Sequence, residues 1–580
     1  MAKEKVDKTI IEKAEKWLTN MYDEETRDIV HDMIDNKPDE LIDSFYRDLE
    51  FGTGGLRGII GVGTNRMNKY TVGMATQGLA NYLKKVFPNV KELSAAVAFD
   101  CRIKSDYFAQ ITAEVLSANG FKVYIFEELR PTPELSFAIR HLKCQTGVMI
   151  TASHNPKEYN GYKAYWDDGA QMVPPHDKNV IDEVQKIKIE EVKFKGIEKN
   201  IIKLGKEIDD AFLGEVEKLS LSHGSNVRQS NLRIVYTPLH GTGVHMVPAA
   251  LERYGFENVF KVYQQDINDG NFPTIVSPNP EEPAALEMAL DKARKVDADL
   301  VLATDPDADR VGVAVKDLNE NYVILNGNQT AAILTYYLLS LWHKREKLTG
   351  KEYIVKTIVT TELLADIAKK YKVEYYDVLT GFKWIADIIR KNEGKKVFIG
   401  GGEESYGFMI GDFVRDKDAI SSCAMVAEVA AWAANQRKGL FDILVDIYVE
   451  FGFYKEKLLS VTKKGKSGAE EIQKMMENFR ANPPAKINNS PVVLIKDYLT
   501  GKEIDIKNKK EATIELPKSN VLQYFTADGT KISMRPSGTE PKIKFYFSAK
   551  DELKAREDFD SVNQKLDEKF DKIIKELALK

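Results

Sequence analysis

Cysteine is scarce in this 580-residue sequence, which contains only Cys101, Cys144 and Cys423. The three lie far apart and form no C-x-x-C pair, so a disulfide framework and a structural zinc site are excluded. The chain also lacks a run of about 18 apolar residues, the length that a membrane-spanning helix needs. Its amino terminus has recurring charges and no continuous apolar segment, unlike a signal peptide. These absences predict a cytoplasmic protein with reduced thiols.

An excess of positive charge is missing as well. The sequence has 83 Lys and Arg residues against 88 Asp and Glu residues, a formal net charge of −5. Binding to nucleic acid through bulk electrostatics needs a cationic domain or face, so we expect neither nucleic acid nor membrane as a partner. A hydrophobic content of 43% excludes a disordered chain. At about 150 residues per domain, the length predicts roughly four domains.

Residues 1–45 predict a helical lead-in. Thr9 and Glu12 have the spacing of a capping box, and apolar residues follow at helical intervals. Beyond the lead-in, short apolar runs that predict strands alternate with longer stretches that predict helices. The strand runs are residues 95–99, 123–126, 148–150, 234–236, 300–303 and 397–399, and two clear helices are residues 247–254 and 284–295. This alternation predicts α/β layers with sheets covered on both faces.

Charged tracts and changes of pattern divide the chain further. The last unit has more strand than helix until a terminal amphipathic helix marked by Leu566, Phe570, Ile573 and Leu577. After the lead-in at 1–45, we predict α/β domains at 46–205, 206–320 and 321–453 and an α+β domain at 454–580. In such sheets the loops at the carboxyl ends of strands line the binding crevice, so the chemistry is expected there.

The loop after the predicted strand 148–150 contains Ser153 and His154. A serine at a strand end, flanked by small residues, can act as a nucleophile or phosphate carrier, and the adjacent imidazole can move a proton. A plain Ser/Asn turn closed by Pro156 has the same local pattern, and the pattern alone favours that turn.

The loop after the predicted strand 300–303 contains Asp305, Asp307 and Asp309. Carboxylates at this spacing point to one side of an extended segment and repel unless a cation lies among them, which favours Mg²⁺ over a solvated acidic turn. An EF-hand is excluded, because Arg310 and Lys316 stand at its glycine and glutamate positions.

Two further loops offer groups for a sugar phosphate. Glu403 and Ser405 lie in a glycine-rich loop after the predicted strand 397–399, and their oxygens suit sugar hydroxyls. The segment 535–541 combines Arg535 with two hydroxyls and a glycine, a composition that can form an anion nest. Either segment can equally be an ordinary turn, and Arg57 and Lys383 elsewhere can be surface charges.

Six ordered motifs together resemble the α-D-phosphohexomutase family, the phosphoglucomutases and phosphomannomutases. They are GTGGLRG, TASHNP, DPDADR, TGFKW, GEESYG and RPSGTEP, and the resemblance spans about residues 45 to 550. It implies three similar α/β sandwich domains and a C-terminal α+β domain around a central cleft. It also implies an intramolecular phosphotransferase of the isomerase class.

The resemblance implies roles for the catalytic and metal residues. Ser153 would cycle through phosphoserine and complete a site for one Mg²⁺ with Asp305, Asp307 and Asp309. Arg57 and Arg310 would hold phosphate charge near the transfer centre, and Lys163 would be the acid/base, with His154 and Lys383 as further candidates. Thr380, Gly381, Glu403 and Ser405 would contact the sugar, while Arg535, Ser537, Gly538 and Thr539 would hold the phosphate that is not transferred.

The motifs also indicate a substrate. GEESYG resembles the glucose-type members, whereas the lead-in and FGTGGLRG resemble a branch that includes phosphopentomutases and a glucose-1,6-bisphosphate synthase. We therefore favour interconversion of glucose 1-phosphate and glucose 6-phosphate through glucose 1,6-bisphosphate, by a monomer or weak homodimer. Ribose and mannose phosphates are expected as secondary substrates.

Two other classes of protein are weighed against a mutase. A Mg²⁺-dependent sugar-phosphate phosphatase would use Asp305 as nucleophile and Asp307 as acid/base, but the threonine that dehalogenase-type phosphatases carry nearby is replaced by Ala308-Asp309-Arg310. A non-catalytic sugar-phosphate sensor is disfavoured, because the serine, the three aspartates and the phosphate loop are all intact.

Overall fold

A computed structural model of the chain describes residues 6–50, 55–463, 465–537 and 542–579. Where the sequence predicts a helical lead-in, the structure has three short helices that pack on Trp17, Phe45 and Tyr70: α1 (Lys8–Glu15), α2 (Glu24–Asn36) and α3 (Pro38–Phe45). The prediction of Thr9 as the first N-cap is wrong. Asp7 is the cap, because its carboxylate reaches the Thr9 amide at 2.8 Å.

The first sheet has the order β1-β5-β4-β2-β3-β6, with parallel pairing among β2, β3, β4 and β6. Its strands are β1 (Leu56–Ile59), β2 (Ser94–Phe99), β3 (Lys122–Phe126), β4 (Thr146–Ile150), β5 (Tyr159–Tyr165) and β6 (Ile201–Leu204), and its helices are α4 (Lys69–Val86), α5 (Ser105–Ala118), α6 (Thr132–His141) and α7 (His176–Val184). Alternate residues of β2 enter two different apolar clusters, Ala96 and Ala98 one and Ala95 and Val97 the other. Both faces are therefore covered, as predicted.

The second sheet has the order β11-β10-β9-β7-β8. Its strands are β7 (Ile234–Thr237), β8 (Val259–Lys261), β9 (Leu300–Thr304), β10 (Val311–Lys316) and β11 (Tyr322–Leu325), and its helices are α8 (Lys206–Lys218), α9 (His223–Arg228), α10 (Gly243–Arg253) and α11 (Pro283–Val296). Strand β11 returns antiparallel along β10 after a tight turn closed by Asp317 and Asn321. The second sheet consequently extends past the predicted boundary at residue 320.

The third sheet has the order β13-β12-β14-β15, in which only β15 is antiparallel to its neighbour. Its strands are β12 (Glu352–Thr357), β13 (Glu374–Val378), β14 (Val397–Gly402) and β15 (Phe408–Ile410), and its helices are α12 (Gly327–Lys344), α13 (Leu363–Lys370), α14 (Phe382–Asn392), α15 (Ala419–Ala434) and α16 (Leu440–Phe451). Helix α15 also packs against α9 and α10, so the second and third units share an apolar core.

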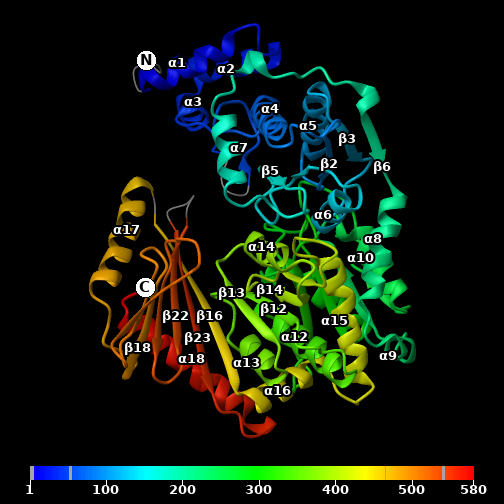
Figure 1. Cartoon of the computed structure of the whole chain (residues 1–580), viewed down its shortest axis with the longest axis vertical. Coiled ribbons are helices and arrows are strands. Elements are labelled where there is room, and N and C mark those ends of the chain that lie inside the picture. The colour runs from blue at the N-terminus through cyan, green and yellow to red at the C-terminus, as the bar shows by residue number, and fades with distance from the viewer. Residues whose placement is uncertain (1–5, 51–54, 464, 538–541, 580) are drawn as a thin grey trace.

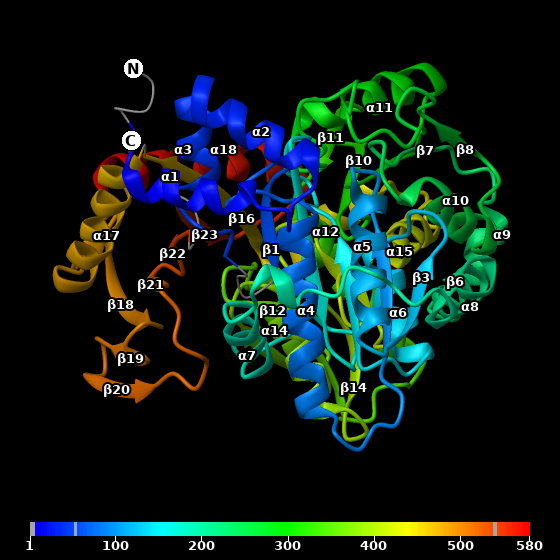
Figure 2. The ribbon, with the colours of Figure 1, turned by 90° about the horizontal axis from the view of Figure 1, so that it is seen from above.

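The C-terminal unit is an antiparallel sheet with the order β16-β23-β22-β21-β18-β19-β20, and β17 pairs with β18. Its elements are β16 (Phe453–Thr462), α17 (Gly465–Ala481), β17 (Lys486–Ile487), β18 (Ser490–Asp497), β19 (Lys502–Asp505), β20 (Lys510–Thr513), β21 (Leu522–Thr526), β22 (Lys531–Pro536), β23 (Lys542–Asp551) and α18 (Phe559–Glu576). Helix α18 buries Leu566, Phe570 and Ile573, which confirms the predicted terminal helix. Figures 1 and 2 show this sheet standing beside the α/β layers.

The predicted α/β class, with a strand-rich last unit, is confirmed. Each predicted strand run coincides with a strand, and the two predicted helices are α10 and α11. Among the described residues, no helix carries an apolar stretch long enough to cross a bilayer.

Candidate active site

Ser153 lies just beyond β4, as the sequence predicted for a strand-end serine. Its φ angle is +52°, a left-handed backbone conformation that non-glycine residues rarely adopt. The side chain is buried, and its Oγ donates a hydrogen bond to Oδ2 of Asp305 at 2.9 Å. The Nδ1 atom of His154 is 3.2 Å from the same Oγ. The strained loop thus presents one hydroxyl to both a carboxylate and an imidazole.

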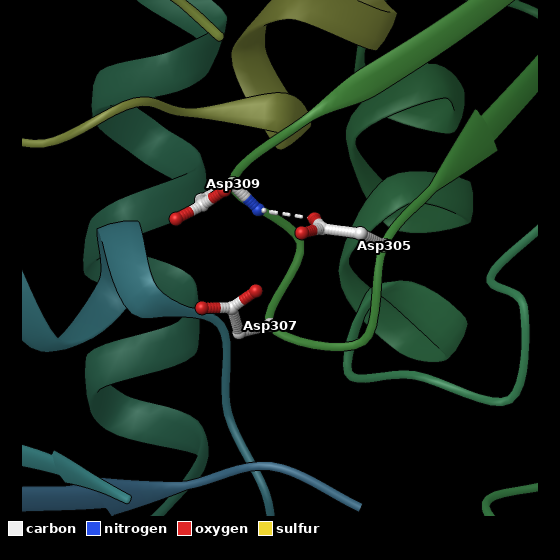
Figure 3. Close-up of side chains that lie close together, drawn as sticks. All are labelled: Asp305, Asp307 and Asp309. Atoms are coloured by element: carbon white, nitrogen blue, oxygen red, sulfur yellow. Dashed lines mark hydrogen bonds between the residues drawn. The ribbon is translucent and has the colours of Figure 1, made fainter. Parts of the chain in front are cut away.

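Asp305, Asp307 and Asp309 follow β9 and converge as predicted (Figure 3). Each offers a ligand oxygen, these oxygens lie within 4.8 Å of one another, and all three residues are buried. Burial and the charges of Asp307 and Asp309 raise the pKa of Asp305 well above its usual range. Three carboxylates held this closely need cations to remain ionised together.

Two lysines supply positive charge to this triad. Lys163, on β5, lies 2.7 Å from Asp307 and 3.6 Å from Asp309. Burial opposes ionisation of Asp307, but the Lys163 ammonium outweighs it and holds the pKa of Asp307 below its usual range. Lys417 lies 3.0 Å from Asp309 and 3.1 Å from Asp416. The sequence analysis missed Lys417, although four successive charged residues before the apolar helix α15 were a possible signal.

The cations expected near the transfer centre come from a strand of the first unit and a loop of the second. Arg57, on β1, donates to the Asn155 side chain at 3.3 Å and lies in the field of Asp307 and Arg310. Arg310 donates to Glu281 at 2.5 Å, an acidic partner that the sequence analysis did not find. Burial and the neighbouring cations Arg310 and Arg57 hold the pKa of His154 well below its usual range. The imidazole is therefore neutral near pH 7.

The predicted sugar-binding segments meet each other. Glu403 follows β14, and its Oε1 accepts a hydrogen bond from the Gly381 amide at 2.9 Å, which joins the loop of Thr380 to the loop of Ser405. Lys383, in the first turn of α14, lies 3.3 Å from Asp177 of α7. This ion pair connects the third unit to the first.

The predicted phosphate loop is described only in part. Arg535 lies near the end of β22, and the Ser537 amide donates to the carbonyl of Lys542 at 2.7 Å. Gly538 and Thr539 lie outside the described residues. The role of this loop therefore stays a prediction.

Four family models match successive parts of the chain. They are described as phosphoglucomutase/phosphomannomutase alpha/beta/alpha domains I, II and III and the C-terminal domain, and they match residues 48–191, 210–319, 326–451 and 461–565.

Two curated relatives agree with these family models. The phosphoglucomutase of Staphylococcus haemolyticus is 37% identical over 530 residues, 88% of this chain and 94% of that protein. The phosphoglucomutase of Staphylococcus aureus strain MRSA252 is 38% identical over 531 residues, 91% of this chain and 93% of that protein.

Two crystal structures share the fold. One is the open form of pp63/parafusin, a phosphoglucomutase from Paramecium, with a TM-score of 0.65 and 16% identity over 88% of this chain and 91% of that one. The other is a phosphoglucomutase/phosphomannomutase family protein from Burkholderia thailandensis, with a TM-score of 0.63 and 18% identity over 90% of this chain and 96% of that one. The chain belongs to the phosphoglucomutase/phosphomannomutase family and is a phosphohexomutase, an enzyme of the isomerase class.

Proposed function

We propose that the chain interconverts glucose 1-phosphate and glucose 6-phosphate through phospho-Ser153 and a glucose 1,6-bisphosphate intermediate. The main support for this proposal is that Oγ of Ser153 lies 2.9 Å from Oδ2 of Asp305, one of three buried aspartates that converge. The substrate rests on the relatives from Staphylococcus, which are phosphoglucomutases.

The donor set of the triad fits Mg²⁺. Oδ1 of Asp307 and Oδ1 of Asp309 are buried and have no hydrogen-bond partner among the described residues. Hard carboxylate oxygens in such a position are the ligands that Mg²⁺ prefers, with a phosphate oxygen to complete the set. Asp305, Asp307, Asp309 and phospho-Ser153 would hold it. When bound, Mg²⁺ would neutralise charge on the transferring phosphoryl group.

The protein's own groups would carry the transfer. Phospho-Ser153 gives its phosphoryl group to a free hydroxyl of the sugar monophosphate, and the bisphosphate then reorients and returns its other phosphate to Ser153. Arg57 and Arg310 stabilise the equatorial oxygens, which is the dominant requirement of phosphoryl transfer. Lys163 or His154 would move the proton of the sugar hydroxyl.

The remaining predicted residues would hold the substrate. Glu403 and Ser405, with the adjoining loop of Thr380 and Gly381, contact the sugar. Arg535 and Ser537, together with Gly538 and Thr539, hold the phosphate that is not transferred. This division gives the bisphosphate one reacting end and one anchored end at a time.

Product analysis tests the proposal. The enzyme is incubated with glucose 1-phosphate, Mg²⁺ and a trace of glucose 1,6-bisphosphate, in parallel with the phosphates of mannose, ribose and glucosamine. We expect glucose 6-phosphate as the fastest product and loss of activity in EDTA that Mg²⁺ restores. Release of inorganic phosphate would indicate a phosphatase instead, and a faster rate with another sugar would change the assigned substrate.

A further inference from the structure

Arg102 occupies a buried position behind the serine loop. It follows β2, and its side chain has no exposed surface. Nη1 donates to the carbonyl oxygens of Pro156 at 2.9 Å and Tyr159 at 3.0 Å. Nη2 donates to the carbonyl of Ser153 at 2.5 Å and to that of Asn155. One guanidinium thus binds four carbonyl groups between residues 153 and 159.

This arrangement compensates for a strained backbone. The left-handed conformation of Ser153 (φ +52°) costs free energy and persists only where surrounding contacts enforce it. The loop turns its carbonyl groups inward, and buried carbonyls without a donor are unfavourable. A planar guanidinium can satisfy several of them at fixed angles, which an ammonium group cannot.

The carboxylate of Asp100 holds the Arg102 side chain in place. Its Oδ2 is 3.4 Å from Nε of Arg102, and neither atom has a hydrogen-bond partner among the described residues. Its Oδ1 accepts from the Arg102 amide at 2.9 Å and from the Ser105 hydroxyl at 2.6 Å. Because both side chains are fully buried, each is the charge partner of the other.

A loop of the second unit closes over this pair. The guanidinium carbon of Arg102 lies 5.1 Å from the centre of the Phe272 ring. Gly270 lies so close to the first unit that a Cβ on it would be 2.5 Å from the Ile103 amide nitrogen and 2.7 Å from the Cys101 carbonyl oxygen. The position of Arg102 therefore depends on contact between two units.

We propose that Arg102 is a positioning residue for phosphoryl transfer. It holds the Ser153 loop in the conformation that presents Oγ to the incoming phosphate, and the loop that carries Gly270 and Phe272 holds Arg102 in place. The inference rests on the proposed phosphoserine chemistry. It assigns a function in catalysis to a side chain that does not touch the substrate.

The variant Arg102→Lys tests this inference, because it keeps the positive charge and loses the planar donor set. We expect kcat to fall by on the order of 100-fold, the effect of misplacing a reacting group by about 1 Å. The KM for glucose 1-phosphate should change less than about threefold, since the predicted substrate contacts remain. Phosphorylation of Ser153 by glucose 1,6-bisphosphate, followed by intact mass, should slow by the same factor as kcat.

Arg66→Lys is the matched control. Arg66 is also buried in the first unit and donates to the carbonyls of Asp43 and Asn65 and to the Asp43 carboxylate, but it contacts the lead-in and not the serine loop. The control should lose stability without the selective loss of kcat. If both variants lose kcat equally, or if Arg102→Lys keeps the wild-type kcat, the inference is wrong.

Gly270→Ala provides a second variant, which acts from the second unit and leaves Arg102 unchanged. We expect a smaller loss of kcat, on the order of tenfold, with KM again nearly constant. If Arg102→Lys does not fold, Gly270→Ala becomes the test of the inference. A wild-type kcat in Gly270→Ala then refutes it. If wild-type Ser153 itself takes up no phosphate from the bisphosphate, the proposed function fails and not only the role of Arg102.

Discussion

Replacing Lys163 with methionine should destabilise the protein without Mg²⁺ far more than with it. Lys163 pairs with Asp307 and Asp309 in a buried site, so the substitution leaves Asp307 without an ion-pair partner among the described residues. Removing one member of a buried ion pair costs about 3–5 kcal/mol. Lys417 remains 3.0 Å from Asp309, which places the expected loss near the lower limit, about 3 kcal/mol.

This loss can be measured as a change in Tm. For a domain of roughly 150–250 residues, 1 kcal/mol corresponds to about 2–4 °C, so the Tm in EDTA should fall by roughly 6–12 °C. Saturating Mg²⁺ should restore most of that decrease, because the bound cation supplies the missing positive charge. The kcat should stay low even with Mg²⁺, by about 10²–10⁴-fold, if Lys163 moves the hydroxyl proton.

Lys356→Met is the matched control. Lys356 is a fully buried lysine of β12 that also pairs with two carboxylates, Asp377 at 2.7 Å and Glu362 at 3.2 Å, away from the aspartate triad. Its loss of stability should be the same in EDTA and in Mg²⁺. The reasoning is refuted if Mg²⁺ rescues both variants to the same extent, or if it rescues neither.

Three other predictions concern single side chains. Ser153→Ala should fold normally and lose mutase activity by several orders of magnitude, because the phosphate carrier is removed, and turnover close to the wild-type rate would contradict the mechanism. Arg535→Ala should raise the KM for glucose 1-phosphate at least about tenfold and release more bisphosphate, which product analysis can detect; unchanged values would remove the last unit from substrate binding. Burial raises the pKa of Asp418 to about 6, so the wild type should lose up to about 1.4 kcal/mol of stability per pH unit as the pH rises from 4 to 6. Asp418→Asn should remove this slope in urea unfolding while keeping the cap on α15, and an unchanged slope would exclude Asp418 as its source.

Local sequence patterns predicted the elements and the loops that carry chemistry. Apolar runs of three or four residues shortly before Ser153 or Asp305 mark a buried strand and the loop at its carboxyl end, and both features follow from neighbouring residues alone. The exact cap of α1 was missed because Asp7 and Thr9 are both suitable caps, and only the backbone geometry decides between them.

The partners of the site residues could not be predicted in the same way. Lys163 and Asp307 are 144 positions apart, and no periodicity links them. Lys417 reaches Asp309 only because the segment before α15 packs beside the metal loop, where the Ala419 amide donates to the Ala308 carbonyl. The sequence motif identified the three aspartates, but the packing of separate units determines which lysines neutralise their charge.

The strained residues of the site explain why these contacts between units matter. Ser153, Ala308 and Tyr406 each have a positive φ and lie in the serine, metal and sugar loops. Each of these loops is held by a group from another segment: Arg102 binds the first, the Ala419 amide the second, and the Val311 amide donates to the Tyr406 carbonyl at 3.1 Å. Because this conformation costs free energy in non-glycine residues, contacts with other segments must stabilise it. Arg102 does so within the first unit, whereas the metal and sugar loops acquire their geometry when the second and third units pack together. Separation of the units should therefore relax the metal and sugar loops and also move Lys163 and Lys417 away from the aspartate triad.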